Sequence, residues 1–155
     1  MKRSTRVLNE LLVEIFNDIM MIEQRALKEG RFNDLSITEI HTIEAIGMYT
    51  PRSMSEVAND LQITVGTLTA AINNLVKKEY VQRKRIEEDR RIVQIQLTKK
   101  GKLAYRVHDQ FHIDMIKATV QGIQDKEEKI LIESLEKLNA FFKSKYSLKD
   151  GKKNE

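Results

Sequence analysis

The sequence predicts a mainly α-helical fold with one small β-hairpin. Apolar residues recur at helical spacing over most of the 155-residue chain, as in helices that bury one face. Serine or threonine stands where several of these segments begin, as helix capping requires. Two runs rich in β-branched residues, which suit strands, occur within residues 81–97. Helices are therefore expected to build most of the fold, with a short hairpin between them.

The first expected helix covers residues 5–28 and is ended by Gly30. A second helix begins after Ser36, because Ser36 and Glu39 form a capping box in which each side chain bonds the backbone amide of the other residue. Its inward face is expected to consist of Ile37, Ile40, Ile43 and Ile46.

The middle of the chain has the outline of a helix-turn-helix followed by a hairpin. Ser53 and Glu56 form another capping box and open a short helix, and Thr64 can cap a further helix that runs to about Lys78. The strand-like runs 81–86 and 91–97 follow, joined by four polar residues. This order predicts a winged helix-turn-helix.

Two long helices follow the hairpin. Thr98 can cap the first, which Gly122 ends, and Asp125 with Glu128 starts the second. The inward face of the first is expected to consist of Leu103, Val107, Phe111 and Met115. The terminal helices carry more apolar surface than the small middle unit can cover, so we expect a two-fold homodimer built on them.

These expectations divide the chain into segments with different roles. They are an N-terminal dimerisation helix (1–35), a winged helix-turn-helix lobe (36–98), C-terminal dimerisation helices (99–146) and a flexible tail (147–155).

Composition excludes several classes of protein. The chain has no cysteine, which rules out disulfides, thiolate nucleophiles and cysteine-ligated metal sites. Acidic residues interrupt the apolar N-terminal segment, so we expect no signal peptide. No apolar run approaches the ~20 residues of a membrane span. We therefore expect a cytoplasmic protein without a membrane partner.

Positive charge is concentrated in one segment. Between Lys77 and Arg106 there are 11 Lys and Arg against 4 Asp and Glu, a local charge of +7, although the whole chain carries only +4. A basic segment in an otherwise acidic chain is typical of a protein that binds a polyanion. Charge alone also fits an ordinary solvated surface.

The helix after Thr64 has an outward face that suits the major groove of DNA. With its leucines and isoleucine turned to the core, its outward residues are Gly66, Thr69, Ala70, Asn73 and Lys77. Asn73 can pair bidentately with adenine, and Thr69 or Ala70 can contact a thymine methyl group. Thr64 and Thr67 can donate to phosphates at the helix N-terminus. Any one of these residues could also be an ordinary exposed polar position.

The hairpin carries cations suited to the DNA backbone. Its strands and tip are crowded with Arg83, Lys84, Arg85, Arg90 and Arg91, as a wing laid along phosphates requires. Lys84, Arg90 and Arg91 are the expected DNA contacts, and an arginine at the tip can enter a minor groove. Asp89 would by itself repel DNA, but beside Arg90 it could orient the guanidinium through a charge-assisted hydrogen bond.

Several of these residues together resemble the MarR family of winged-helix repressors. The matching stretches are Asp89-Arg90-Arg91, Leu97-Thr98-Lys99-Lys100-Gly101, Gly66-Thr67-Leu68-Thr69 and Leu75-Val76-Lys77-Lys78. The resemblance covers roughly residues 5–146. It implies a homodimer joined through the terminal helices, with recognition helices in major grooves and wings in flanking minor grooves. Glu79 departs from the pattern, because a glycine usually ends the recognition helix there. Either a left-handed glutamate is then strained, or the helix end is built differently.

Within that family, three stretches resemble the repressors of bacterial fatty-acid synthesis. They are Arg31-Phe32-Asn33-Asp34-Leu35-Ser36, Glu39-Ile40-His41-Thr42-Ile43 and Arg106-Val107-His108-Asp109-Gln110-Phe111-His112. This resemblance implies that acyl chains carried on acyl carrier protein act as the effector and strengthen DNA binding. It also implies a hydrophobic tunnel fed by residues such as Phe16, Met20 and Ile43.

The histidines offer an alternative effector site. His108 and His112 are four residues apart and share a helix face. Two histidines of one helix, a third from another and a carboxylate make a tetrahedral zinc set. The spacing resembles a metal site of the MarR-type zinc-uptake repressors, which implies Glu23, His41, His108 and His112 as ligands. The same histidines could instead be hydrogen-bonded links between the dimer helices and the lobe.

No catalytic arrangement stands out in the sequence, so an enzyme is not expected. The expected function is that of a sequence-specific repressor of fatty-acid synthesis genes, which binds a palindromic operator on double-stranded DNA as a homodimer. A helical protein–protein adaptor with an incidental basic hairpin is the alternative from another class, and the two differ in operator preference and salt dependence.

Overall fold

The computed structural model describes residues 2–148, so most of the expected tail 147–155 lies outside the described residues. The mainly helical class with a small sheet is confirmed. The described elements are α1 (Arg3–Glu29), α2 (Ile37–Ile46), β1 (Arg52–Ser53), α3 (Met54–Leu61), α4 (Val65–Lys77), β2 (Val81–Arg85), β3 (Val93–Leu97), α5 (Lys99–Val120) and α6 (Asp125–Tyr146).

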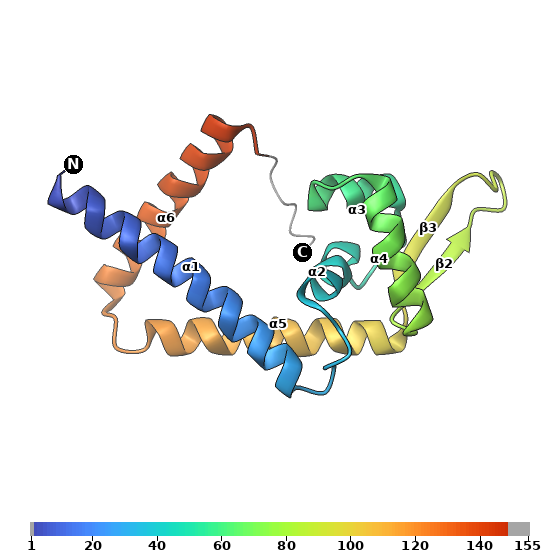
Figure 1. Cartoon of the computed structure of the whole chain (residues 1–155), viewed down its shortest axis with the longest axis horizontal. Coiled ribbons are helices and arrows are strands. Elements are labelled where there is room, and N and C mark those ends of the chain that lie inside the picture. The colour runs from blue at the N-terminus through green and yellow to red at the C-terminus, as the bar shows by residue number, and fades with distance from the viewer. Residues whose placement is uncertain (1, 149–155) are drawn as a thin grey trace.

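The chain has a lobe and a set of long helices that extend from it (Figure 1). α2, α3 and α4 pack with the three strands to form the lobe, while α1, α5 and α6 reach away from it. The lobe holds the hydrophobic core, whose side chains at most 1% exposed include Ile40, Ile43, Ile46, Val57, Leu68, Ile72, Leu75 and Ile95. The inward faces expected for the lobe helices are therefore confirmed except at Ile37, which is only half-buried.

The sheet has three strands, one more than the sequence predicted. β2 and β3 pair antiparallel over their whole length, as the hairpin prediction requires. β1 consists only of Arg52 and Ser53 and pairs with β3, which gives the order β1-β3-β2. Arg52 is held in place because its guanidinium donates to the Ala45 carbonyl at 2.6 Å and pairs with Asp60 at 2.7 Å. Two residues are too few to show a strand pattern in sequence.

Most helix starts follow the capping prediction. The hydroxyls of four residues each accept a hydrogen bond from the amide three residues later: Ser36, Ser53, Thr64 and Thr98. The start of α6 differs from the prediction. Gln124 is the N-cap, and Glu127 rather than Glu128 reaches back to accept from the Gln124 amide at 3.0 Å. Asp125 is therefore the first helical residue and not the cap.

The inward face of α5 differs from the prediction in most of its residues, although the expected Leu103 packs half-buried against the core. The buried residues of α5 are Gly101, Ala104 and His108. None of the expected residues is buried, and Val107 is 46% exposed. A Cβ added to Gly101 would lie only 2.1 Å from the Tyr80 carbonyl oxygen, so α5 approaches the lobe through small residues. A pattern of large apolar residues cannot detect such a contact.

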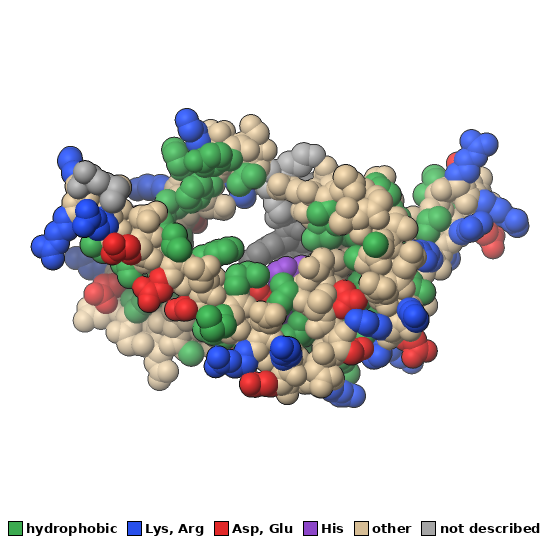
Figure 2. All heavy atoms as spheres, in the orientation of Figure 1, with side chains coloured by type: hydrophobic (Ala, Val, Ile, Leu, Met, Phe, Trp, Pro, Cys, Tyr) green, Lys and Arg blue, Asp and Glu red, His purple; other side chains and the backbone are tan. Residues whose placement is uncertain are grey.

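The long helices keep large apolar surfaces uncovered in the single chain. None of the described α6 residues is buried, and Glu23 alone is buried on α1. Phe16 is 65% exposed and Phe141 is 56% exposed. Figure 2 shows hydrophobic side chains gathered on α6 and along α1. Contiguous apolar surface of this kind marks an interaction site. No helix within residues 2–148 combines the length and apolarity needed to cross a bilayer.

Candidate nucleic-acid interface and effector sites

The outward face of α4 is free of packing against the rest of the chain. Leu68, Ile72 and Leu75 are 0% exposed, so the opposite side of the helix faces solvent. Exposed there are four of the predicted residues, Gly66, Ala70, Asn73 and Lys77. Thr69 is half-buried, and its hydroxyl donates to the Val65 carbonyl at 2.8 Å. Its hydroxyl hydrogen is therefore already used within the helix.

The N-terminus of α4 retains one hydroxyl hydrogen for an outside acceptor. Thr64 Oγ1 accepts the Thr67 amide at 3.1 Å and lies 2.9 Å from Thr67 Oγ1. Two hydroxyls carry two hydrogens, and only one of them can bridge the pair. The other can donate to an anion, which the helix dipole already favours at this end. This geometry suits a phosphate oxygen.

Asp89 shapes the wing tip by accepting hydrogen bonds from the backbone amides that follow it. Its Oδ1 accepts the Arg91 amide at 3.0 Å, and its carbonyl accepts the Ile92 amide at 3.0 Å. Within residues 2–148, Asp89 makes no ion pair with Arg90, so the expected orientation of that guanidinium is not observed. The connection between β2 and β3 covers residues 86–92, longer than expected, although the Ile86 amide still donates to the Ile92 carbonyl at 3.2 Å.

The cations of the wing are available for contact. The predicted residues Lys84, Arg90 and Arg91 are all exposed. Figure 2 shows Lys and Arg side chains at the projecting end of the molecule, which Figure 1 identifies as the β2–β3 wing. A projecting cationic hairpin beside an exposed helix face can follow the backbone of a duplex while the helix meets base edges.

One wing cation, which the sequence analysis assigned only to the DNA backbone, reaches the recognition face. The guanidinium of Arg83 on β2 donates a hydrogen bond to Asn73 Oδ1 on α4. Both residues are exposed. A signal was present in the sequence, because alternation from the buried Val81 turns residue 83 to the same face of the strand.

Of the two helix ends that the sequence allowed at Glu79, the structure has the strained, left-handed one. Glu79 has a φ of 68°, in the left-handed region. The Tyr80 amide bonds the Leu75 carbonyl at 2.9 Å and the Glu79 amide bonds the Val76 carbonyl at 3.0 Å. These bonds define a Schellman motif with glutamate where glycine is preferred.

The three histidines and Glu23 meet between α1, α2 and α5. Glu23 Oε1 lies 2.8 Å from the Nε2 atoms of both His41 and His108, and 3.4 Å from that of His112. The Nε2 atoms of His108 and His112 are 3.0 Å apart. Glu44, which the sequence prediction missed, places Oε1 3.6 Å from His108 Nε2. All four predicted residues therefore converge.

The cluster is polar but lies largely inside the protein. Glu23 is 3% exposed and His108 is 5% exposed. Burial would raise the pKa of the Glu23 carboxyl, but the hydrogen bonds and charges of His41 and His108 outweigh burial and hold that pKa below its ordinary 4.5. A negative Glu23 therefore favours a positive charge, such as a metal ion, within the cluster.

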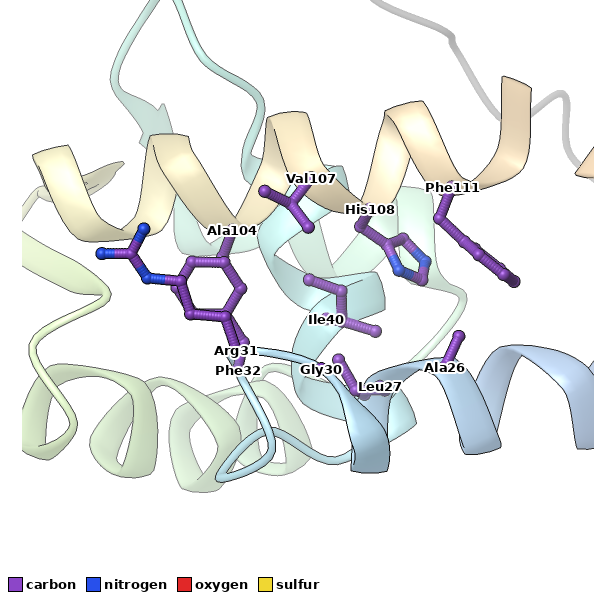
Figure 3. Close-up of a pocket in the computed structure, with 10 residues that line it drawn as sticks. All are labelled: Ala26, Leu27, Gly30, Arg31, Phe32, Ile40, Ala104, Val107, His108 and Phe111. Atoms are coloured by element: carbon purple, nitrogen blue, oxygen red, sulfur yellow. The ribbon is translucent and has the colours of Figure 1, made fainter. Parts of the chain in front are cut away.

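A small apolar cavity lies beside the cluster (Figure 3). It measures about 50 Å³ and is lined by Ala26, Leu27, Gly30, Arg31, Phe32, Ile40, Ala104, Val107, His108 and Phe111. The residues expected to feed an acyl tunnel do not line it. Phe16 and Met20 are exposed on α1, and Ile43 is 0% exposed within the core of the lobe.

An exposed recognition helix, a capped helix-turn-helix and a cationic wing define a winged helix-turn-helix DNA-binding protein. The chain belongs to the MarR family, whose sequence profile matches residues 35–93. The structure of Streptococcus pneumoniae FabT in complex with DNA is 39% identical and superposes with a TM-score of 0.86. That match covers 90% of this chain and 98% of that one.

Other relatives agree on the class. HTH-type transcriptional regulator PchR of Bacillus subtilis is 24% identical, over 76% of this chain and 74% of its own length. The S. aureus MepR–DNA complex is 19% identical with a TM-score of 0.70, covers 86% of this chain and 96% of its own, and shares the fold. The chain is thus a DNA-binding transcription regulator and not an enzyme. The alternative of an adaptor that does not bind DNA was wrong.

Proposed function

We propose that the chain is a repressor of fatty-acid synthesis genes that binds a palindromic operator as a homodimer and responds to acyl chains on acyl carrier protein. The similarity to FabT at 39% identity over 90% of the chain carries this proposal. The sequence stretches that resemble fatty-acid-synthesis repressors support it independently of the recognition helix and the wing, because they lie in the α1–α2 connection, α2 and α5.

The dimer is supported by the uncovered helices. A second copy can cover the apolar faces of α1, α5 and α6 with identical faces of its own, as a two-fold interface requires. Two copies then present two α4 helices and two wings to one duplex, which accounts for a palindromic operator.

The apolar cavity supports an acyl effector. Its walls come from α1, the α1–α2 connection, α2 and α5, so a chain bound there would touch both the dimer helices and the lobe (Figure 3). About 50 Å³ is less than the ~300–1,000 Å³ of pockets that enclose drug-sized ligands. A long acyl chain therefore needs additional walls, which the second copy or a movement of side chains supplies.

Fluorescence anisotropy with an operator duplex tests the proposal. Long-chain acyl carrier protein should lower the Kd for DNA at least tenfold, and unacylated carrier protein should not. Ala26→Phe should fill the cavity and abolish the response, with DNA binding in the absence of effector unchanged. An identical Kd with both forms of the carrier protein would reject the acyl effector.

The histidine cluster favours zinc regulation as a second candidate. Ligands about 2.0–2.1 Å from a tetrahedral zinc lie about 3.4 Å from one another. Glu23 Oε1 lies 2.8–3.4 Å from the Nε2 atoms of all three histidines, and those of His108 and His112 are 3.0 Å apart, so these donor pairs are at or slightly below the separation expected around zinc. Glu23, His41, His108 and His112 would hold the ion, and zinc would supply bonds that join α1, α2 and α5.

Zinc binding can be measured on the protein alone, by competition with a chromophoric chelator. One zinc per chain should bind, and thermal unfolding should shift upward. His112→Ala, at a half-exposed position, should weaken binding at least tenfold. Glu44→Gln is the matched variant and should leave binding nearly unchanged if Glu44 is not a ligand. No binding at micromolar zinc, or equal binding by His112→Ala, would reject the zinc candidate and leave the acyl proposal standing.

A further inference from the structure

We propose that Asn73 and Arg83 read one base pair as a unit, and that Arg83 directs this unit toward guanine. The hydrogen bond between them joins the recognition helix to the wing. The Arg83 guanidinium therefore lies beside Asn73 on the exposed face of α4. The other residues predicted for this face are small or neutral, apart from Lys77 at the end of α4.

The register of the sheet explains why Arg83 can reach α4. Val81 is 2% exposed and faces the core, and side chains alternate along a strand, so Arg83 lies on the same face as Val81. Its cross-strand partner is Ile95, which is 0% exposed and belongs to the same face. Arg83 therefore emerges at the edge of the core beside α4, whereas Lys84 lies on the opposite face of β2.

The chemistry of arginine fixes the orientation of the Asn73 amide. Arginine carries only donors, so its partner on Asn73 must be the carbonyl oxygen. The Asn73 Nδ2 group then keeps both hydrogens for an outside acceptor. The guanidinium also keeps further hydrogens and is always charged. Together the two side chains present mainly donors.

A donor-rich surface matches guanine better than adenine. In the major groove guanine presents two acceptors, N7 and O6, whereas adenine presents the N7 acceptor and the N6 amino donor. Bidentate pairing with adenine would require Asn73 Oδ1 to accept from N6 while it already accepts from the Arg83 cation. The charge would also oppose the approach of another donor. The pair therefore favours guanine, in place of the adenine expected for Asn73 alone.

Selection from a randomised duplex library, with wild type and variants, tests this inference. Wild type should select guanine at one position in each half-site. Arg83→Ala should lose that preference at the same position, and Kd for the guanine duplex should rise about 5- to 150-fold, the span of about 1–3 kcal/mol for one good base contact. Lys84→Ala is the matched control on the other face of the strand. It should weaken all duplexes equally and lower the salt dependence.

Two further measurements separate base reading from a phosphate contact. Replacing the selected guanine by 7-deazaguanine removes N7, and it should weaken wild type but not Arg83→Ala. Asn73→Ala and Arg83→Ala should be non-additive for the guanine duplex, because each change disrupts the same unit. Equal weakening of every duplex by Arg83→Ala, or an unaltered preference, would overturn the inference. Both residues are exposed, so the variants are expected to fold, and thermal unfolding verifies this.

Discussion

The ring of Phe32 meets the ring of Tyr80 edge-on, with centroids 6.0 Å apart and planes inclined by 71°. Phe32 also lines the apolar cavity, and Tyr80 follows directly after the recognition helix, bonded to its Leu75 carbonyl. The cavity is therefore connected to the end of α4 through two side chains in contact. An effector that displaces Phe32 would act on Tyr80, and through it on the angle of the recognition helix.

The buried hydroxyl of Tyr80 predicts a loss of stability at alkaline pH. Burial and the 2.6 Å hydrogen bond to Asp34 raise the pKa of Tyr80 well above its ordinary 10. A group with a raised folded pKa stabilises fully below its unfolded pKa and loses that contribution as pH rises through the folded pKa. We expect Tyr80→Phe to lower the free energy of unfolding by about 1 kcal/mol at pH 8. The difference from wild type should shrink above pH 10.

Urea unfolding between pH 8 and 11, at one fixed protein concentration, measures this difference. Tyr146→Phe is the matched control, because Tyr146 is 61% exposed and its hydroxyl has no hydrogen bond among the described residues. A difference between wild type and Tyr80→Phe that stays constant over this range would contradict the assigned role of the hydroxyl.

The left-handed Glu79 predicts that a glycine would stabilise the fold. A non-glycine residue at positive φ costs about 1–2 kcal/mol, and glycine removes the steric part of that cost. Glu79→Gly should raise the free energy of unfolding by about 1 kcal/mol in chemical denaturation. Glu79→Ala removes the same side chain but keeps the Cβ, so it should give no such gain. Equal effects of the two substitutions would show that backbone strain is not the cause.

Features set by neighbouring residues could be predicted from the sequence, while those set by packing could not. Ser36 and Thr64 cap helices as expected, because capping depends on residues within one turn. The inward face of α5 was missed because Gly101 approaches the lobe by being small. Glu44 was missed because it enters the histidine cluster only once α2 and α5 have packed. Periodicity carries no information on either contact.

The exposed position of Arg90 on the wing predicts that Arg90→Ala weakens DNA binding. Arg90 is exposed at the wing tip and makes no ion pair within residues 2–148, so it is available to a groove. Removing it should cost about 1–3 kcal/mol of affinity for an operator duplex, measured by anisotropy, while sedimentation shows an unchanged oligomeric state. Arg25→Ala, an exposed arginine on α1, should leave affinity unchanged. If Arg90→Ala bound the operator with wild-type affinity, the wing tip would not be part of the DNA interface.

Two glycines give opposite predictions for the same substitution. Gly101→Ala should lower the free energy of unfolding by at least about 2 kcal/mol, because its Cβ would meet the Tyr80 carbonyl carbon and oxygen. Gly66→Ala should leave stability equal or improve it by up to about 1 kcal/mol, since the nearest atom, Thr64 Oγ1, would be 3.9 Å from the Cβ.

The DNA affinity of Gly66→Ala then tests how closely α4 approaches a duplex. Gly66 is exposed in the first turn of α4, on the recognition face and between Thr64 and Thr67 in the sequence. If the backbone comes into contact with DNA at this point, an added methyl group must push the helix away. We therefore expect weaker operator binding from a protein that is as stable as wild type. Unchanged affinity would mean that α4 enters the groove through its later residues, Ala70 and Asn73, and that its first turn stands clear of the duplex.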